Sequence, residues 1–174
     1  MTATVVIGLG NPILGDDGVG WRVAELVKEK LQTENRGAAG LPAGPHPVSI
    51  ECYALGGLSL MENLVGYEQA IIIDAIHLGN CPQGTVSVMT LDELPNRAAG
   101  HLASAHDTTL HNALRMGREM GAKLPESITI VAIESDQVYD FSEELSPAVQ
   151  AAIPLACQRV LDTLNKITLQ EEVP

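Results

Sequence analysis

Residues 8–17 read GLGNPILGDD and follow the β-branched run 4–7. A short apolar run that stops at glycine is typical of a strand buried on both faces of a parallel sheet. Apolar side chains then recur at helical spacing, so we expect a helix that starts near Asp16 or Asp17 and runs to about Leu31. The stretch therefore predicts a strand, a glycine-rich turn and a helix in succession.

The rest of the chain repeats this alternation of strands and helices. Further strands are predicted at 48–54, 70–76, 84–91 and 128–134, of which 84–91 alternates in polarity and suits an edge. Further helices are predicted from a capping box at 59–62 through Leu64, over 107–121, and from Ser146-Pro147 to 164, with a kink or a restart at Pro154. This order favours an α/β fold: a single three-layer domain with a mainly parallel twisted sheet and helices on both faces.

The domain is expected to span 1–168. The Gly- and Pro-rich stretch 33–47 (TENRGAAGLPAGPHP) predicts a mobile loop inside it, and 169–174 a frayed tail. In such sheets ligands bind beyond the carboxyl ends of the strands, so the functional residues are expected there.

The net charge of -12 excludes nucleic acid as a favoured partner, because an acidic protein repels a polyanion. No signal peptide or membrane-spanning run is visible, and no membrane association is expected. The three cysteines form no CxxC pair, which favours reduced thiols and a cytoplasmic location. The sequence leaves the oligomeric state open.

The turn itself is neither a P-loop nor a dinucleotide cradle. Gly15, at the place of the second P-loop glycine, is followed by Asp16 and Asp17 instead of a lysine and a hydroxyl residue. The GxGxxG spacing is also absent, so no organic cofactor is expected. One acid is enough to cap the following helix, which is worth about 1 kcal/mol. We therefore predict that Asp17 faces the ligand crevice, with Asn11 and Asp16 in supporting positions.

Asp74 interrupts the apolar run IIIDAI near its carboxyl end. A buried carboxylate is costly unless it is paired, hydrogen-bonded or bound to a metal, so Asp74 is a second candidate. Among the histidines, His101, His106 and His111 are spaced by five and cannot form an i,i+4 ligand pair. His106 lies at the edge of an element and is the third candidate, and His77 is held in reserve.

Two carboxylates and one imidazole form a mixed oxygen and nitrogen donor set. Such a set suits nickel, zinc or manganese, and the sequence does not choose among these metals.

Four segments together resemble the hydrogenase maturation proteases. They are GLGNPILGDDGVG (8–20), IIIDAI (71–76), SAHDTTL (104–110) and IVAIESDQVYDFSEELSPAV (130–149), in the order and at the spacing found in that family. The resemblance implies an endopeptidase that removes a C-terminal tail from the large-subunit precursor of a nickel-iron hydrogenase after nickel insertion.

The resemblance also implies which residues form the site. The family's metal-contacting positions fall on Asp17, Asp74 and His106, with nickel supplied by the precursor. A water polarised by the metal or by a carboxylate would attack the scissile carbonyl, which makes Asp17 and Asp74 the catalytic candidates. If the metal is only recognised, Asp16 or Asp17 would be the general base.

Two departures from the family pattern concern the matching large subunit more than the reaction. Some members have glutamate where this chain has Asp17, and many have an Asp-Gly-Gly-Thr-like turn where it has Ala54-Leu55-Gly56-Gly57-Leu58. Two alternatives remain at this point. One is a nickel-binding assembly chaperone that does not cut, and the other is a peptidyl-tRNA hydrolase, which GLGNP resembles but which the acidic charge disfavours.

Overall fold

The computed structural model describes residues 3–37, 48–94, 109–136 and 141–171. Five strands form one sheet in the order β2-β1-β3-β5-β4. They are β1 (Thr4–Leu9), β2 (Val48–Tyr53), β3 (Gln69–Ile76), β4 (Val86–Thr90) and β5 (Ser127–Glu134). β1, β2, β3 and β5 are parallel, whereas β4 lies at the edge and runs antiparallel to β5. The predicted mainly parallel sheet with an edge strand is confirmed.

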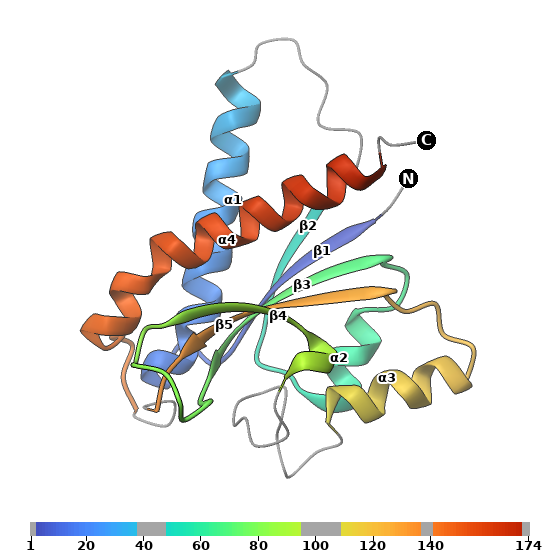
Figure 1. The fold of residues 1–174 in the computed structure, drawn as a ribbon, viewed down its shortest axis with the longest axis horizontal. Coiled ribbons are helices and arrows are strands. Elements are labelled where there is room, and N and C mark those ends of the chain that lie inside the picture. The colour runs from blue at the N-terminus through green and yellow to red at the C-terminus, as the bar shows by residue number, and fades with distance from the viewer. Residues whose placement is uncertain (1–2, 38–47, 95–108, 137–140, 172–174) are drawn as a thin grey trace.

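Helices cover both faces of the sheet, which confirms the single three-layer α/β domain (Figure 1). α1 (Val19–Gly37) and α4 (Pro147–Glu171) pack on one face, and α2 (Gly57–Asn63) and α3 (Leu110–Glu119) on the other. None of the helices in the described segments is long and apolar enough to cross a membrane.

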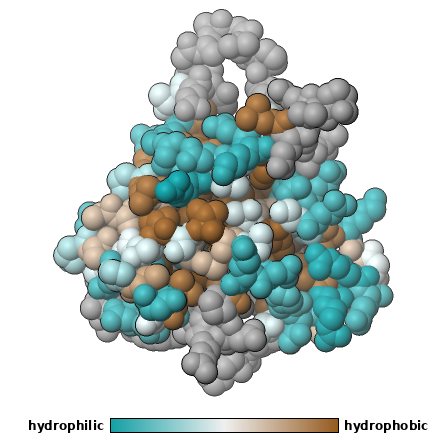
Figure 2. All heavy atoms as spheres, in the orientation of Figure 1, coloured by the Kyte–Doolittle hydropathy of each residue, from teal (hydrophilic) through white to brown (hydrophobic). Residues whose placement is uncertain are grey.

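The central strand β3 is buried on both of its faces. Ile71, Ile73 and Ala75 pack with α1 and α4, while Ile72 and Ile76 pack with α2 and α3. Two buried faces explain why this segment reads as an unbroken apolar run. At the edge, β4 is only partly buried, and hydrophobic residues lie exposed among hydrophilic ones on the face shown in Figure 2.

The first helix begins later and ends later than predicted. Asp16 and Asp17 lie in the 3-10 turn η1 (Gly15–Gly18), and α1 begins at Val19. α1 continues to Gly37, so the predicted loop 33–47 begins too early, and 38–47 lie outside the described residues. The helix thus extends past the point where the glycines and prolines of this stretch predicted a break.

The predicted capping box at 59–62 is wrong. α2 begins at Gly57 with the extended Gly56 as its N-cap, and the N–H of Leu60 donates to the carbonyl of Gly56. Ser59 is therefore inside the helix. The two glycines turn the chain from β2 directly into α2, because Gly57 adopts a φ of 50° that other residues avoid.

The last helix begins at Pro147 as predicted and runs without a break through Pro154 to Glu171. The alternative of a restart at Pro154 is wrong, and the tail predicted from 169 is helical to 171. Pro154 and Gln150, four residues earlier, are both exposed. Water can therefore bind the Gln150 carbonyl that lacks an intrahelical donor.

α3 is shorter than the predicted helix 107–121. It begins at Leu110, and the side chain of Thr109 accepts the N–H of Asn112 as an N-cap. The start predicted at Asp107 lies outside the described residues.

Substituting Gly10 with alanine should destabilise the fold strongly. Gly10 has a φ of 125°, and a Cβ there would collide with the carbonyl of Asp17. Gly66 has a φ of 92° with nothing within 4 Å, so Gly66→Ala adds backbone strain alone. In urea unfolding, we expect Gly66→Ala to cost about 1 kcal/mol and Gly10→Ala about 3 kcal/mol or more. Equal losses would contradict the close approach of Gly10 to Asp17.

Candidate functional site

The backbone of the turn after β1 binds the carboxylate of Asp17. The backbone N–H of Asn11 donates to Asp17 Oδ2 at 2.6 Å, and the N–H of Asp17 donates to the carbonyl of Leu14. The side-chain oxygen of Asn11 accepts the N–H of Ile13 at 3.2 Å, which fixes the same turn. Asp17 is buried, so its carboxylate is held in one place by the backbone that surrounds it.

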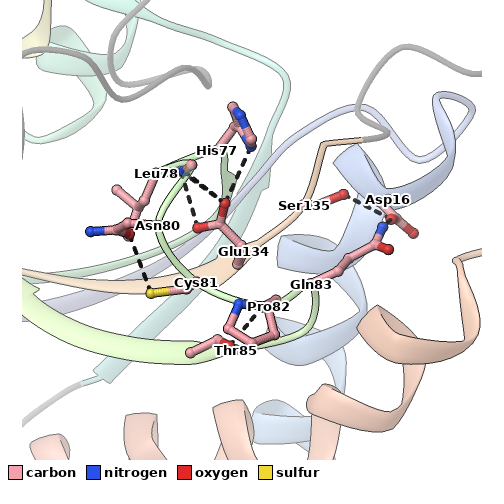
Figure 3. A network of polar contacts seen from close by, with 11 residues as sticks. Asp16, His77, Leu78, Asn80, Cys81, Pro82, Gln83, Thr85, Glu134 and Ser135 are labelled. Atoms are coloured by element: carbon pink, nitrogen blue, oxygen red, sulfur yellow. Dashed lines mark hydrogen bonds and ion pairs between the residues drawn. The ribbon is translucent and has the colours of Figure 1, made fainter.

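The carboxylate of Asp16 accepts hydrogen bonds from three distant parts of the chain. Ser146 donates its N–H at 2.6 Å and its hydroxyl at 2.8 Å. The Ser135 hydroxyl donates at 2.8 Å and the Gln83 amide at 3.1 Å, and both side chains converge on Asp16 in Figure 3.

This arrangement differs from the expected cap of the first helix. The N-cap residue of η1 makes no side-chain hydrogen bond. The carboxylate of Asp16 lies instead beside the N-terminus of α4, which Ser146 immediately precedes. The positive end of a long helix stabilises a carboxylate placed there. Asp16 therefore stabilises the fold by linking the turn after β1 to the start of the last helix, α4.

Asp74 is fully buried near the carboxyl end of β3, opposite Ala132 of β5. Side chains alternate along a strand, so Asp74 is on the α2 and α3 face with Ile72 and Ile76. The turn η1 contacts β3, and the backbone of Gly20 lies against the carbonyl of Ile73. The structure thus places Asp17 and Asp74 at the same edge of the sheet.

The third predicted member, His106, lies outside the described residues, as do His46 and His101. Within the described segments, no group of three or more His, Cys, Asp or Glu side chains is placed to hold a metal ion. The ligand roles of Asp17, Asp74 and His106 stay predictions. His111 is on the surface of α3, with its Nε2 at 3.1 Å from Asp92 Oδ1.

Sequence reasoning missed a further buried acid at this edge, Glu134. It is the last residue of β5, much as Asp74 lies near the end of β3, and it is only 3% exposed. Its carboxylate accepts the N–H groups of Leu78 and Gly79 at 3.0–3.1 Å. The available signal was a glutamate that closes an apolar strand, the same signal that identified Asp74.

His77, the reserve candidate, directly follows β3 and contacts Glu134. Its Nδ1 is 3.2 Å from Glu134 Oε1, and about half of the side chain is exposed. Figure 3 shows the imidazole on the loop between β3 and β4, above the Glu134 carboxylate. The structure therefore adds a histidine and a glutamate to the edge that carries Asp74.

Two of the cysteines are unsuited to nucleophilic chemistry. Burial raises the pKa of the Cys52 thiol, and Glu25 and Glu51 raise it further. Burial also raises the pKa of the Cys157 thiol. Because the thiolate is the reactive form, a raised pKa disfavours nucleophilic chemistry at both side chains.

Comparisons with known proteins identify the family of the chain. The family model described as hydrogenase maturation protease matches residues 55–163, more than half of the chain. The chain belongs to the hydrogenase maturation protease family. The matched region contains Asp74, His77 and Glu134, whereas Asp17 precedes it.

Individual relatives of this family member match almost its whole length. The hydrogenase 2 maturation protease of Escherichia coli K12 is 25% identical over 93% of this chain and 90% of that protein. The hydrogenase expression/formation protein HoxM of Azotobacter vinelandii is 24% identical over 92% of this chain and 71% of that protein. The solved structure of the hydrogenase maturating endopeptidase HybD from E. coli has a TM-score of 0.72 and 25% identity, covering 95% of this chain and 93% of that chain.

Membership of the hydrogenase maturation proteases decides the class of reaction. The protein is a hydrolase of peptide bonds, and this replaces the peptidyl-tRNA hydrolase alternative. The functional question for this protease becomes which groups at the carboxyl edge of the sheet serve the cleavage.

Replacing Asp16 with asparagine should destabilise this protease. An amide nitrogen cannot accept the hydrogen bonds that Ser146, Ser135 and Gln83 donate to the Asp16 carboxylate. We expect a loss of about 2–4 kcal/mol of unfolding free energy in urea denaturation. Asp92→Asn is the matched control, because Asp92 is exposed, and it should change stability by less than about 0.5 kcal/mol. A loss at Asp16 no larger than at Asp92 would contradict the structural role.

Proposed function

We propose that this protease removes the C-terminal extension of the large-subunit precursor of a nickel-iron hydrogenase after nickel has been inserted. The observation that carries the proposal is the pair of buried carboxylates, Asp17 and Asp74, at the ligand-binding edge of a hydrogenase maturation protease. Buried carboxylates are costly to maintain, so their retention at such an edge favours a functional role.

The proposed substrate brings its own nickel. Carboxylate oxygens together with an imidazole nitrogen suit a borderline divalent ion such as nickel, and His106 is the proposed third contact. Contact with the nickel would report that insertion is complete and would orient the tail for cleavage. A water polarised by the metal or by a carboxylate then attacks the scissile carbonyl.

The structure disfavours one predicted catalytic role, that of Asp16 as general base. Asp16 was an alternative general base, but its carboxylate already accepts four hydrogen bonds from the protein. A base must reach the proton of the attacking water at about 3 Å, and Asp16 is committed elsewhere. Asp17 and Asp74 remain the proposed catalytic carboxylates.

The proposed compartment is the cytoplasm. Cys52, Cys81 and Cys157 are all free thiols, and free thiols persist in a reducing compartment. The net charge of -12 disfavours nucleic acid as a further partner.

Cleavage should depend on nickel and on Asp74. We expect the purified protein to shorten nickel-loaded large-subunit precursor, followed by intact mass, and to leave the nickel-free precursor uncut. Asp74→Asn keeps the side-chain shape but removes the charge, so the rate should fall at least about 100-fold. The exposed Asp92→Asn serves as the control and should cleave at the unsubstituted rate.

Three results would contradict the proposal. Equal cleavage of the nickel-loaded and nickel-free precursors would show that cleavage does not depend on nickel. Full activity of Asp74→Asn would show that the Asp74 carboxylate is not catalytic. Binding without cleavage, for precursors of several hydrogenase groups, would favour the assembly chaperone instead.

A further inference from the structure

The Glu134 carboxylate organises the loop that follows β3. It accepts the N–H groups of Leu78 and Gly79, and the main chain of Glu134 pairs with both Gly84 and Thr85. One residue thus binds both ends of the loop between β3 and β4. The charge is almost fully buried, and backbone N–H groups replace the water it has lost.

The same carboxylate contacts the His77 imidazole. His77 Nδ1 is 3.2 Å from Glu134 Oε1, and because a carboxylate only accepts hydrogen bonds, this contact favours a proton on Nδ1. In a neutral ring protonated at Nδ1, the lone pair is on Nε2. The side chain is about half exposed, so solvent reaches the ring.

The pair lies next to Asp74 in the sheet. Glu134 is opposite Ile76, and Asp74 is opposite Ala132, so the two acids occupy neighbouring strands two residues apart. Alternation places both side chains on the face of α2 and α3, where Leu78 also packs. The strand rise and spacing put their Cα atoms about 8 Å apart, roughly the span of two residues of an extended peptide.

We propose that His77 is a catalytic residue that transfers the proton during peptide hydrolysis, and that Glu134 is its positioning residue. This inference rests on the proposed function and names the group that takes the proton from water. It differs from the metal-ligand role for which His77 was held in reserve.

His77 Nε2 accepts a proton from the attacking water as its oxygen bonds to the scissile carbonyl carbon. The resulting imidazolium keeps its Nδ1 proton on Glu134 and gives the Nε2 proton to the peptide nitrogen as the C–N bond breaks. The products are a carboxylic acid and an amine, and the imidazole returns to its neutral form.

Other groups at this edge fit the proton transfer less well. Asp16 is saturated by donors, and Asp17 Oδ2 accepts the N–H of Asn11 at 2.6 Å. Burial raises the pKa of the Cys52 thiol, which disfavours the thiolate that would accept a proton. His77 combines access to solvent with a buried carboxylate partner.

The decisive experiment compares His77→Gln with His111→Gln. His111 also contacts a carboxylate, at 3.1 Å, but on the exposed surface of α3, so it controls for loss of a histidine. Single-turnover cleavage of nickel-loaded precursor, read by intact mass, should slow at least about 100-fold in His77→Gln and stay unchanged in His111→Gln. Precursor binding by both variants should remain within about twofold of the unsubstituted protein, because the proton step follows binding.

Two further readouts separate catalysis from a structural role. Free imidazole should restore cleavage to His77→Ala in proportion to its concentration, since the half-exposed position is open to a small base. In Glu134→Gln, the amide can donate to Nδ1, so the nitrogen chemical shifts of His77 should report the Nε2–H tautomer instead of the Nδ1–H tautomer.

The outcomes are distinguishable. If the unsubstituted protein does not cleave, the proposed function fails and the role of His77 fails with it. If the unsubstituted protein cleaves and His77→Gln matches His111→Gln, only this inference is overturned. A slowed His77→Ala that imidazole does not rescue, with a Glu134→Gln tautomer unchanged from the unsubstituted protein, also overturns it.

Discussion

The Asp16 carboxylate connects the beginning of the sequence to its end, and the site is built around that connection. Its donors come from the loop before β4, the end of β5 and the residue before α4. The N–H of Ser135 also donates to the carbonyl of Ile76, so the connection reaches β3. A buried charge needs all of its donors, because removing one partner leaves it uncompensated. The turn that carries Asp17 is therefore fixed relative to the strand ends, although these segments are far apart in sequence.

Asp16 and Asp17 are adjacent in the turn but have different roles, because different parts of the chain surround them. Asp16 takes side-chain and backbone donors from distant elements, whereas Asp17 takes the backbone N–H of Asn11 six residues earlier. With Asp74 and Glu134, four buried carboxylates gather around the carboxyl edge of one sheet. Such a concentration of negative charge attracts a cation and repels phosphate, in keeping with the expectation from the sequence that this glycine-rich turn is not a nucleotide cradle.

The sequence predicted the parts of the fold in which burial determines the residue pattern. β3 and β5 were found because both faces are covered, and Asp74 was conspicuous because it interrupts an apolar run. The start of α2 was missed because backbone conformation at Gly56 and Gly57 outweighed a capping-box signal. Glu134 closes an apolar strand, which was a signal of its burial, but its partners are backbone N–H groups of a loop more than fifty residues away, and no local pattern reveals those contacts.

Two histidine–carboxylate contacts in this chain show how burial decides what such a pair can do. Their lengths are nearly equal, at 3.2 Å for His77 and Glu134 and 3.1 Å for His111 and Asp92. His111 and Asp92 are both exposed, so water competes for each of them and the pair contributes little. Glu134 is buried and held by backbone donors, so its position does not adjust to the histidine. A partner held in this way offers His77 Nδ1 one fixed acceptor, which favours a proton on Nδ1 and, in the neutral ring, a lone pair on Nε2.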